Sequence, residues 1–279
     1  MGRRPRLDEP GVTHHVMNRG VNRQTTFFGD HDRVEFGRRL ADVHDRFGIE
    51  TIAYCLMGNH YHLVVRAPQG GLGSAMHHLG LVYTRRTNER VRRDGPLFRG
   101  RYHSIPITTD AYLLQAVRYV HRNPLDLPGV RRPADYRWSS YRTYLGHRRC
   151  PPFLDTGLVL GMFDGDREGL AAFTDDGRPT WVTTVEDLEQ AVRLAIAEDD
   201  LRHGDDAEVQ RWQERTAMLL VADALRGTTL ARDVLERLDL PSAAARRMAM
   251  KRARDRAADP AIARIVRTVR PTIADRPAA

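Results

Sequence analysis

The sequence predicts an α+β protein: a ferredoxin-like antiparallel sheet with helices on one face, followed by a mainly α-helical C-terminal extension. Strand-like and helix-like patterns alternate through residues 1–146 in the order β-α-β-β-α-β-α, the split pattern of a ferredoxin-like sheet. Beyond residue 146, proline, glycine and aspartate become frequent, and alanine, leucine, arginine and acidic residues then predominate. A chain of 279 residues also exceeds the roughly 100–200 residues of one usual domain. We therefore expect a first domain over residues 1–146, a linker or irregular region over 147–180 and a helical domain over 181–279.

The first two elements are an expected strand over residues 12–21 and an expected helix over residues 31–46. Apolar residues recur at helical spacing through the second segment. Asp30 can cap the first turn of this helix, and Gly48 can end it.

A β-hairpin is expected next, with strands over residues 49–57 and 61–67. Both segments are rich in β-branched and aromatic residues, which favour strands. Gly58 and Asn59 lie between them and suit a short turn.

Three further elements complete the expected first domain: a helix over residues 74–93, a strand over 98–107, and a helix from Asp110 to the residue before Pro124. Ser74 can cap the first of these helices. The second helix ends where it does because proline pushes the preceding residue out of the helical conformation.

The C-terminal region contains two short helical patterns, one over residues 230–238 and one that Ser242 can cap, with a turn at 239–241 between them. Such a pair, with a basic second helix, is typical of helix-turn-helix DNA binding. A helical hairpin with a solvated basic face is the alternative. The residues of the second helix that we expect to contact DNA are Arg246, Arg247 and Lys251.

Charge also points to an acidic partner. The chain has 44 Lys and Arg against 36 Asp and Glu, a net charge of +8. Residues 241–279 hold ten bases and three acids, whereas residues 182–209 hold two bases and nine acids. A basic tail beyond an acidic segment favours a partner-facing surface, with two solvated helix faces as the alternative.

Cysteine content and hydropathy bear on location. Cys55 and Cys150 are too few for a disulfide framework and lack metal-ligand spacing. The charged N-terminus is not followed by an apolar segment, and no run of 18 apolar residues occurs in the sequence. We expect a cytoplasmic protein that does not interact with membranes.

Two histidines, His60 and His62, stand where the expected turn enters the second hairpin strand. Side chains alternate between the faces of a strand, so this pair projects from one face. Two neutral imidazoles placed in this way can share a metal ion. A polar strand face open to water is the alternative.

Tyr119 and Asn123 lie four residues apart on the helix that begins at Asp110, and are therefore neighbours on one flank. This flank differs from the apolar stripe that includes Leu113 and Val117. A phenol one turn from a carboxamide is the arrangement that a metal-assisted tyrosine nucleophile would use, with the amide oxygen as a third metal ligand. A packing tyrosine and a helix-terminating asparagine are the alternatives.

Four blocks of sequence carry a resemblance to a known family: AYCLMGNHYHLVV, PLFRGRYHSIPI, YLLQAVRYVHRNPL and DYRWSSYRTYLG. In this order and spacing they are similar to the REP-associated tyrosine transposases and the related single-strand transposases of small insertion sequences, which are HUH endonucleases. The resemblance extends from about residue 12 to residue 146. Gly58 stands where the family commonly has proline, and Tyr61 where it usually has an aliphatic residue; neither change removes a ligand.

The resemblance implies an enzyme that cleaves and rejoins single-stranded, hairpin or palindromic repeat DNA through a 5′-phosphotyrosine intermediate. It implies that His60, His62 and Asn123 bind a divalent metal and that Tyr119 is the nucleophile. Imidazole and amide ligands without thiolate suit Mg²⁺ or Mn²⁺, although imidazole also accepts zinc. The C-terminal region bears a faint similarity to the DNA-binding domain of bacterial replication initiators, which some family members carry.

The expected substrate form also follows from sterics. A single strand can pass through a basic groove to a tyrosine on a helix flank, whereas a stacked duplex keeps its phosphates away from that tyrosine. Tyr83 and Tyr102 are candidates for stacking on bases, and an arginine-rich helix that is simply solvated is the alternative. The candidate phosphate contacts in the first domain are Arg19, Arg23, Arg85, Arg86, Arg99 and Arg101.

Two other functions compete with a DNA transposase. The first is a catalytically inactive, sequence-specific DNA-binding regulator, which would bind DNA without covalent chemistry. The second is a metal phosphodiesterase that uses water, for which the sequence offers no identifiable general base. We expect the protein to act as a monomer or a homodimer.

Overall fold

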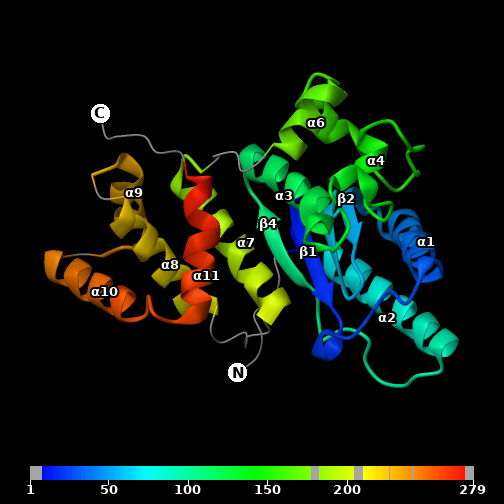
Figure 1. Ribbon diagram of the computed structural model, residues 1–279, viewed down its shortest axis with the longest axis horizontal. Helices are drawn as coiled ribbons and strands as arrows, with labels where there is room; N and C mark the ends of the chain where they lie inside the picture. The colour runs from blue at the N-terminus through cyan, green and yellow to red at the C-terminus, as the bar shows by residue number, and fades with distance from the viewer. Residues whose placement is uncertain (1–7, 177–181, 204–209, 226, 241, 274–279) are drawn as a thin grey trace. The chain divides into compact units, whose positions relative to one another are not determined.

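The computed structural model describes residues 8–176, 182–203, 210–225, 227–240 and 242–273 (Figure 1). The chain folds into two compact units, one made of Met1–Thr108 and Leu113–Asp176 and the other of Thr109–Tyr112 and Gly177–Ala279. Parts of five expectations lie outside the described ranges: residues 1–7 of the charged N-terminus, 177–180 of the expected linker, 204–209 of the acidic segment, Pro241 of the expected turn and 274–279 of the basic tail.

The sheet of the first unit has four strands, β1 (Thr13–Arg19), β2 (Glu50–Leu56), β3 (His60–Arg66) and β4 (His103–Ile107). Their order across the sheet is β2-β3-β1-β4, and each neighbouring pair is antiparallel. The predicted α+β class, the antiparallel sheet and the order of elements along the first unit are confirmed.

Helices α1 (Asp30–Phe47) and α2 (Leu72–Val91) cover one face of this sheet. Val16 of β1 and Leu63 of β3 are paired across the two strands and pack into an apolar core with side chains of both helices. Burial of this apolar surface is the principal driving force for folding of the unit.

Helix α3 (Asp110–Arg122) lies on the other face of the sheet, whereas the sequence predicted helices on one face. Met17 of β1 and His62 of β3 alternate with the core residues of their strands and point to this second face. The ring of Tyr119 on α3 lies 5.2 Å from the ring of His62. Strands β1 to β3 are buried along nearly their whole length, which is typical of strands covered on both faces.

The start of α2 differs from the expected one. The helix begins at Leu72, two residues before Ser74, which we expected to cap it. The carboxylate of Asp8 accepts a hydrogen bond from the Leu72 N–H at 2.7 Å and so takes the capping role. A cap from a distant part of the chain is not recognisable from local sequence.

Residues 147–176 belong to the first unit, although we expected an irregular linker over 147–180. After α4 (Tyr141–Tyr144), this stretch contains α5 (Gly157–Gly161) and α6 (Arg167–Asp175).

Two arginines on α3 hold the C-terminal end of α6. Arg118 donates to the carbonyl of Phe173 and Arg122 to the carbonyl of Thr174, each at 2.8 Å. The last carbonyls of a helix have no partner within the helix, and cations near them are stabilising. These contacts explain why the unit continues to residue 176. The two arginines directly precede Tyr119 and Asn123 in the sequence.

The second unit is helical, as predicted, and its described core includes Val192, Met218 and Ile265. Its helices α7 to α11 are Val185–His203, Gln210–Ala224, Thr229–Arg237, Ala243–Asp255 and Pro260–Val269. The predicted pair α9 and α10 is confirmed, and the Ser242 hydroxyl caps α10 by accepting from the Ala245 N–H at 3.1 Å. In the segments that the structure describes, no helix is both long and apolar enough to cross a bilayer.

Candidate active site

The histidine pair lies on β3, at the end where the hairpin turn enters the strand. His60 and His62 project from the same face, with ring centroids 5.2 Å apart and ring planes nearly perpendicular. His60 is partly exposed, whereas His62 is only 1% exposed.

Asn123 joins the histidines to Tyr119. Its side-chain oxygen Oδ1 lies 3.2 Å from Nε2 of His60, and its Nδ2 lies 3.5 Å from Nε2 of His62. The same Nδ2 donates a hydrogen bond to the Tyr119 hydroxyl at 3.0 Å. The structure therefore brings together all four residues that the sequence singled out for catalysis and metal binding.

Asn59 and Asn123 contact the two ring nitrogens of His60. Asn59 donates its side-chain N–H to the carbonyl of Arg23 at 3.2 Å, so its oxygen faces Nδ1 of His60 at 2.8 Å. A tautomer protonated at Nδ1 would direct the Nε2 lone pair of His60 at the Asn123 oxygen, and a cation between these two atoms would bind both.

The spacing of these atoms fits a small divalent metal. Adjacent ligands in an octahedron with bonds of about 2.0–2.1 Å are about 2.9 Å apart, and Nε2 of His60 lies 3.2 Å from the Asn123 oxygen. Among the described residues, no group of three or more His, Cys, Asp or Glu side chains is arranged to hold a metal ion. A metal at this site would therefore use the amide of Asn123 together with the two histidines.

Sequence reasoning missed His15. This residue of β1 is fully buried, and its Nε2 lies 3.2 Å from Nδ1 of His62. Burial lowers the pKa of His15 to about 3, so the imidazole is neutral at ordinary pH. Its place beside His62 depends on the pairing of β1 with β3, which the sequence does not specify.

Tyr112 is separated from the site. It belongs to the second compact unit, is fully buried, and its pKa is raised by burial. A buried phenol with a raised pKa is a poorer nucleophile than the partly exposed Tyr119.

Four of the candidate DNA-binding arginines lie at the His60 end of the sheet. Arg19 is paired with His60 across β1 and β3, and its carbonyl accepts from the Arg99 N–H at 2.9 Å. Arg23 is exposed in the loop after β1, and Arg101 is exposed just before β4.

The other two arginines of the first domain lie elsewhere. Arg85 and Arg86 are on α2, which covers the face opposite the histidines, and they pair with Glu89 at 2.9 Å and Glu35 at 3.6 Å. The structure does not bring them to the site. The sequence of an arginine-rich helix does not indicate which face of the sheet the helix will cover.

The expected stacking role of two tyrosines is wrong. Tyr83 is completely buried in the core beneath α2 and donates its hydroxyl to the Thr26 carbonyl at 2.7 Å. Tyr102 is 7% exposed and belongs to the same core. Neither presents a ring face to a DNA base.

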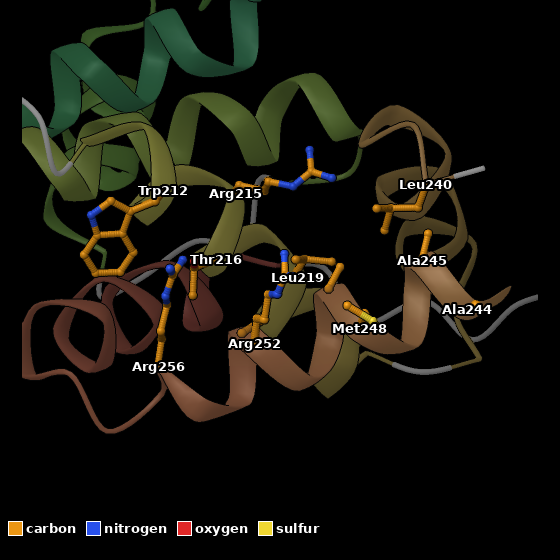
Figure 2. A pocket seen from close by; sticks show the side chains of 12 residues that line it. Trp212, Arg215, Thr216, Leu219, Leu240, Ala244, Ala245, Met248, Arg252 and Arg256 are labelled. Atoms are coloured by element: carbon orange, nitrogen blue, oxygen red, sulfur yellow. The ribbon is translucent and has the colours of Figure 1, made fainter. Parts of the chain in front are cut away.

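The second unit exposes the predicted basic residues on α10: Arg246, Arg247 and Lys251. Two other arginines interact with α8: Arg254 of α10 pairs with Asp223 at 2.6 Å, and the guanidinium of Arg256, which caps the C-terminal end of α10, lies 5.0 Å from the Trp212 ring. Figure 2 shows Trp212 and Arg256 beside a cavity of about 480 Å³ that residues of α8 and α10 line.

Comparison with known proteins finds similarity in the N-terminal part of the chain. Residues 10–123 match the family model described as transposase IS200 like. One similar solved structure is a REP-associated tyrosine transposase bound to a REP hairpin, at 16% identity and a TM-score of 0.47, covering 56% of this chain and 93% of that one. Another is a putative transposase from Deinococcus radiodurans R1, at 17% identity and a TM-score of 0.31, covering 43% of this chain and 97% of that one. A search of curated proteins finds no match to this chain.

The family match spans the whole segment from β1 to Asn123, including both histidines and Tyr119. This agrees with the resemblance of the sequence motifs. The segment that holds the candidate active site therefore matches the model of the IS200-like transposases.

Proposed function

We propose that this protein is a metal-dependent transposase that cleaves and rejoins single-stranded DNA through a 5′-phosphotyrosine intermediate, acting on hairpin or palindromic repeat DNA. One observation carries the proposal: the side chain of Asn123 contacts both the hydroxyl of Tyr119 and Nε2 of His60. A candidate nucleophile and a candidate metal-binding pair thus share one amide.

Tyr119 is the proposed nucleophile. Its hydroxyl oxygen would attack the phosphorus and form a tyrosine–phosphate bond, while the bond from phosphorus to the 3′ oxygen breaks. The phenol loses its proton and the 3′ oxygen gains one, which leaves a 5′-phosphotyrosine and a free 3′-hydroxyl. The reverse reaction with a 3′-hydroxyl rejoins DNA without ATP, because the phosphodiester is conserved.

Asn123 and the histidines would assist this step. The Asn123 amide would orient the Tyr119 hydroxyl through the hydrogen bond that it donates at 3.0 Å. His60, His62 and Asn123 would hold the metal, with Mg²⁺ and Mn²⁺ as the candidates. When bound there, the ion would offset the charge that develops on the phosphate.

The proposed substrate contacts are the basic residues at the His60 end of the sheet. Arg23, Arg99 and Arg101 are exposed there, and guanidinium groups bind phosphate through their fork of donors. Both assemblies that we expect, a monomer and a homodimer, are compatible with a site made of these four residues. We place this activity in the cytoplasm, in keeping with the free Cys55 and Cys150.

A DNA-binding regulator is the second candidate, favoured by the exposed basic side chains of α10. Under that alternative the protein would bind DNA and form no covalent product. A phosphodiesterase that uses water would instead cleave DNA without attaching to it.

The test is incubation of hairpin DNA with the full chain, with and without Mn²⁺, followed by a denaturing gel. Label at the 3′ end of the DNA should move with the protein, whereas label at the 5′ end should appear in a shorter free fragment. Cleavage without linked protein would favour hydrolysis, and a native-gel shift without cleavage would favour the regulator.

A further inference from the structure

His15 contacts two members of the candidate site at once. Its Nε2 lies 3.2 Å from Nδ1 of His62, and the centroids of these rings are 5.4 Å apart. Its ring also meets that of Tyr119 edge-on, with centroids 5.8 Å apart and an angle of 61° between the planes. The three rings form one packed cluster, in which His62 and Tyr119 are themselves 5.2 Å apart.

The hydrogen bonds of His62 assign its protons. The amide nitrogen of Asn123 faces Nε2 of His62 at 3.5 Å, so Nε2 presents a lone pair in that direction. In the tautomer that fits this contact, Nδ1 of His62 carries the proton and donates a hydrogen bond to Nε2 of His15 across 3.2 Å. A partner of this kind fixes both the tautomer and the rotation of a metal-binding imidazole.

The other nitrogen of His15 shows that this arrangement lowers the stability of the fold. Nδ1 of His15 is buried and has no hydrogen-bond partner among the described residues. Buried polar groups in native proteins are rarely left in that state, and an apolar side chain would avoid it. The presence of histidine at this position is therefore not explained by stability.

We propose that His15 is a positioning residue, which holds His62 with Nε2 available to a divalent metal and packs the ring of Tyr119 beside it. This inference rests on the proposed function. Its central element is the hydrogen bond from His62 to His15, which can be examined without any DNA substrate.

The key variant is His15→Leu, which removes the hydrogen bond and the unpaired nitrogen together. His15→Gln is the conservative variant, because its amide oxygen reaches about as far as Nε2 of histidine. The matched control is His14→Leu, since His14 is also buried but points to the other face, where its Nδ1 lies 3.0 Å from the Ser104 hydroxyl.

The first measurement is Mn²⁺ binding to the full chain, followed by the electron paramagnetic resonance of the free ion, together with thermal unfolding. Loss of an outer partner of a metal ligand typically lowers metal affinity by about 10–100-fold. We expect a loss of that size in His15→Leu with an unchanged or higher Tm, recovery of most of the affinity in His15→Gln, and wild-type affinity in His14→Leu. Wild-type Mn²⁺ affinity in His15→Leu, or no Mn²⁺ binding by the wild type, would overturn the inference.

The second measurement uses metal-free protein and the imidazole nitrogen resonances of His62. We expect the tautomer protonated at Nδ1 in the wild type and a mixture of tautomers in His15→Leu. A wild-type ring protonated at Nε2 would refute the proposed hydrogen bond. If these results support His15 but the wild type forms no DNA adduct, the positioning inference stands and the proposed transposase chemistry fails.

Discussion

Asn123 donates a hydrogen bond from its side-chain amide to the hydroxyl of Tyr119 across 3.0 Å, one helical turn along the chain. The oxygen of the same amide lies 3.2 Å from Nε2 of His60 on β3. One carboxamide therefore fixes the distance between the candidate nucleophile and the candidate metal ligands. A displacement of α3 would move Tyr119 and Asn123 together and change their distance from His60.

The first prediction concerns Tyr119→Phe, which removes one oxygen from a partly exposed ring. The variant should form no covalent DNA adduct while it keeps Mn²⁺ binding and DNA affinity. Its free energy of unfolding should fall by no more than about 0.5–1.5 kcal/mol, the usual net contribution of one hydrogen bond. Adduct is measured on a denaturing gel and stability by urea unfolding.

Tyr112→Phe is the control for that variant, because its hydroxyl is buried in the second unit. It should form adduct at the wild-type rate. Peptide mapping of trapped adduct provides an independent check, and DNA attached to Tyr112 or Tyr102 would show that Tyr119 is not the nucleophile.

The second prediction concerns the histidine pair. Replacement of His60 and His62 with alanine should abolish Mn²⁺-dependent cleavage and leave DNA affinity within a few-fold of wild type, since arginines supply most phosphate contacts. His60→Ala alone should have the same effect on cleavage with less effect on folding, because His60 is partly exposed. Cleavage at the wild-type rate in the double variant would exclude a metal site here, and a parallel loss of DNA binding would mean that the histidines maintain the fold.

The third prediction tests α10 as a DNA-binding helix. Arg247→Ala combined with Lys251→Ala should lower the logarithmic salt dependence of DNA binding by about 1.8 for duplex and about 1.4 for single strands, at about 0.9 and 0.7 per phosphate contact. Arg85→Ala combined with Arg86→Ala removes the same charge from α2 and should change the slope much less, because that helix lies opposite the histidine face. If the wild type and the α10 variant have the same salt dependence of DNA binding, α10 does not contact DNA phosphates.

The fourth prediction concerns acid stability and His121. This residue of α3 is fully buried, its Nε2 lies 2.9 Å from the Ser140 hydroxyl, and burial lowers its pKa to about 3. In the unfolded chain His121 binds a proton as the pH falls below about 6.5, whereas in the folded protein it stays neutral. Protonation therefore favours the unfolded state, and this residue makes the protein less stable below about pH 6.5. The expected loss is about 1.4 kcal/mol between pH 7.5 and 5.5.

His121→Gln keeps a polar partner for Ser140 but does not titrate. Urea unfolding at pH 7.5 and 5.5 should show a smaller acid-induced loss in the variant than in the wild type, by about 1.4 kcal/mol. An identical pH dependence in both proteins would show that His121 is accessible to protons in the folded state.

Local periodicity determined much of the candidate site. The period-two alternation of a strand places His60 and His62 on one face, and the helical repeat places Tyr119 one turn from Asn123. Both relationships lie within a single element, so they do not depend on how elements pack. The order of strands and helices was predictable for the same reason, because each element has its own pattern and its own turn residues.

Tertiary structure decided the relationships between elements that are distant in sequence. The pairing of β1 with β3 brings His15 to His62, and a shift of one residue would turn His15 to the other face. The assignment of α2 and α3 to opposite faces separates Arg85 from the site and buries Tyr83. The carbonyls of α6 join residues 147–176 to the first unit through Arg118. Each of these outcomes depends on long-range packing and hydrogen bonds, which local sequence patterns do not encode.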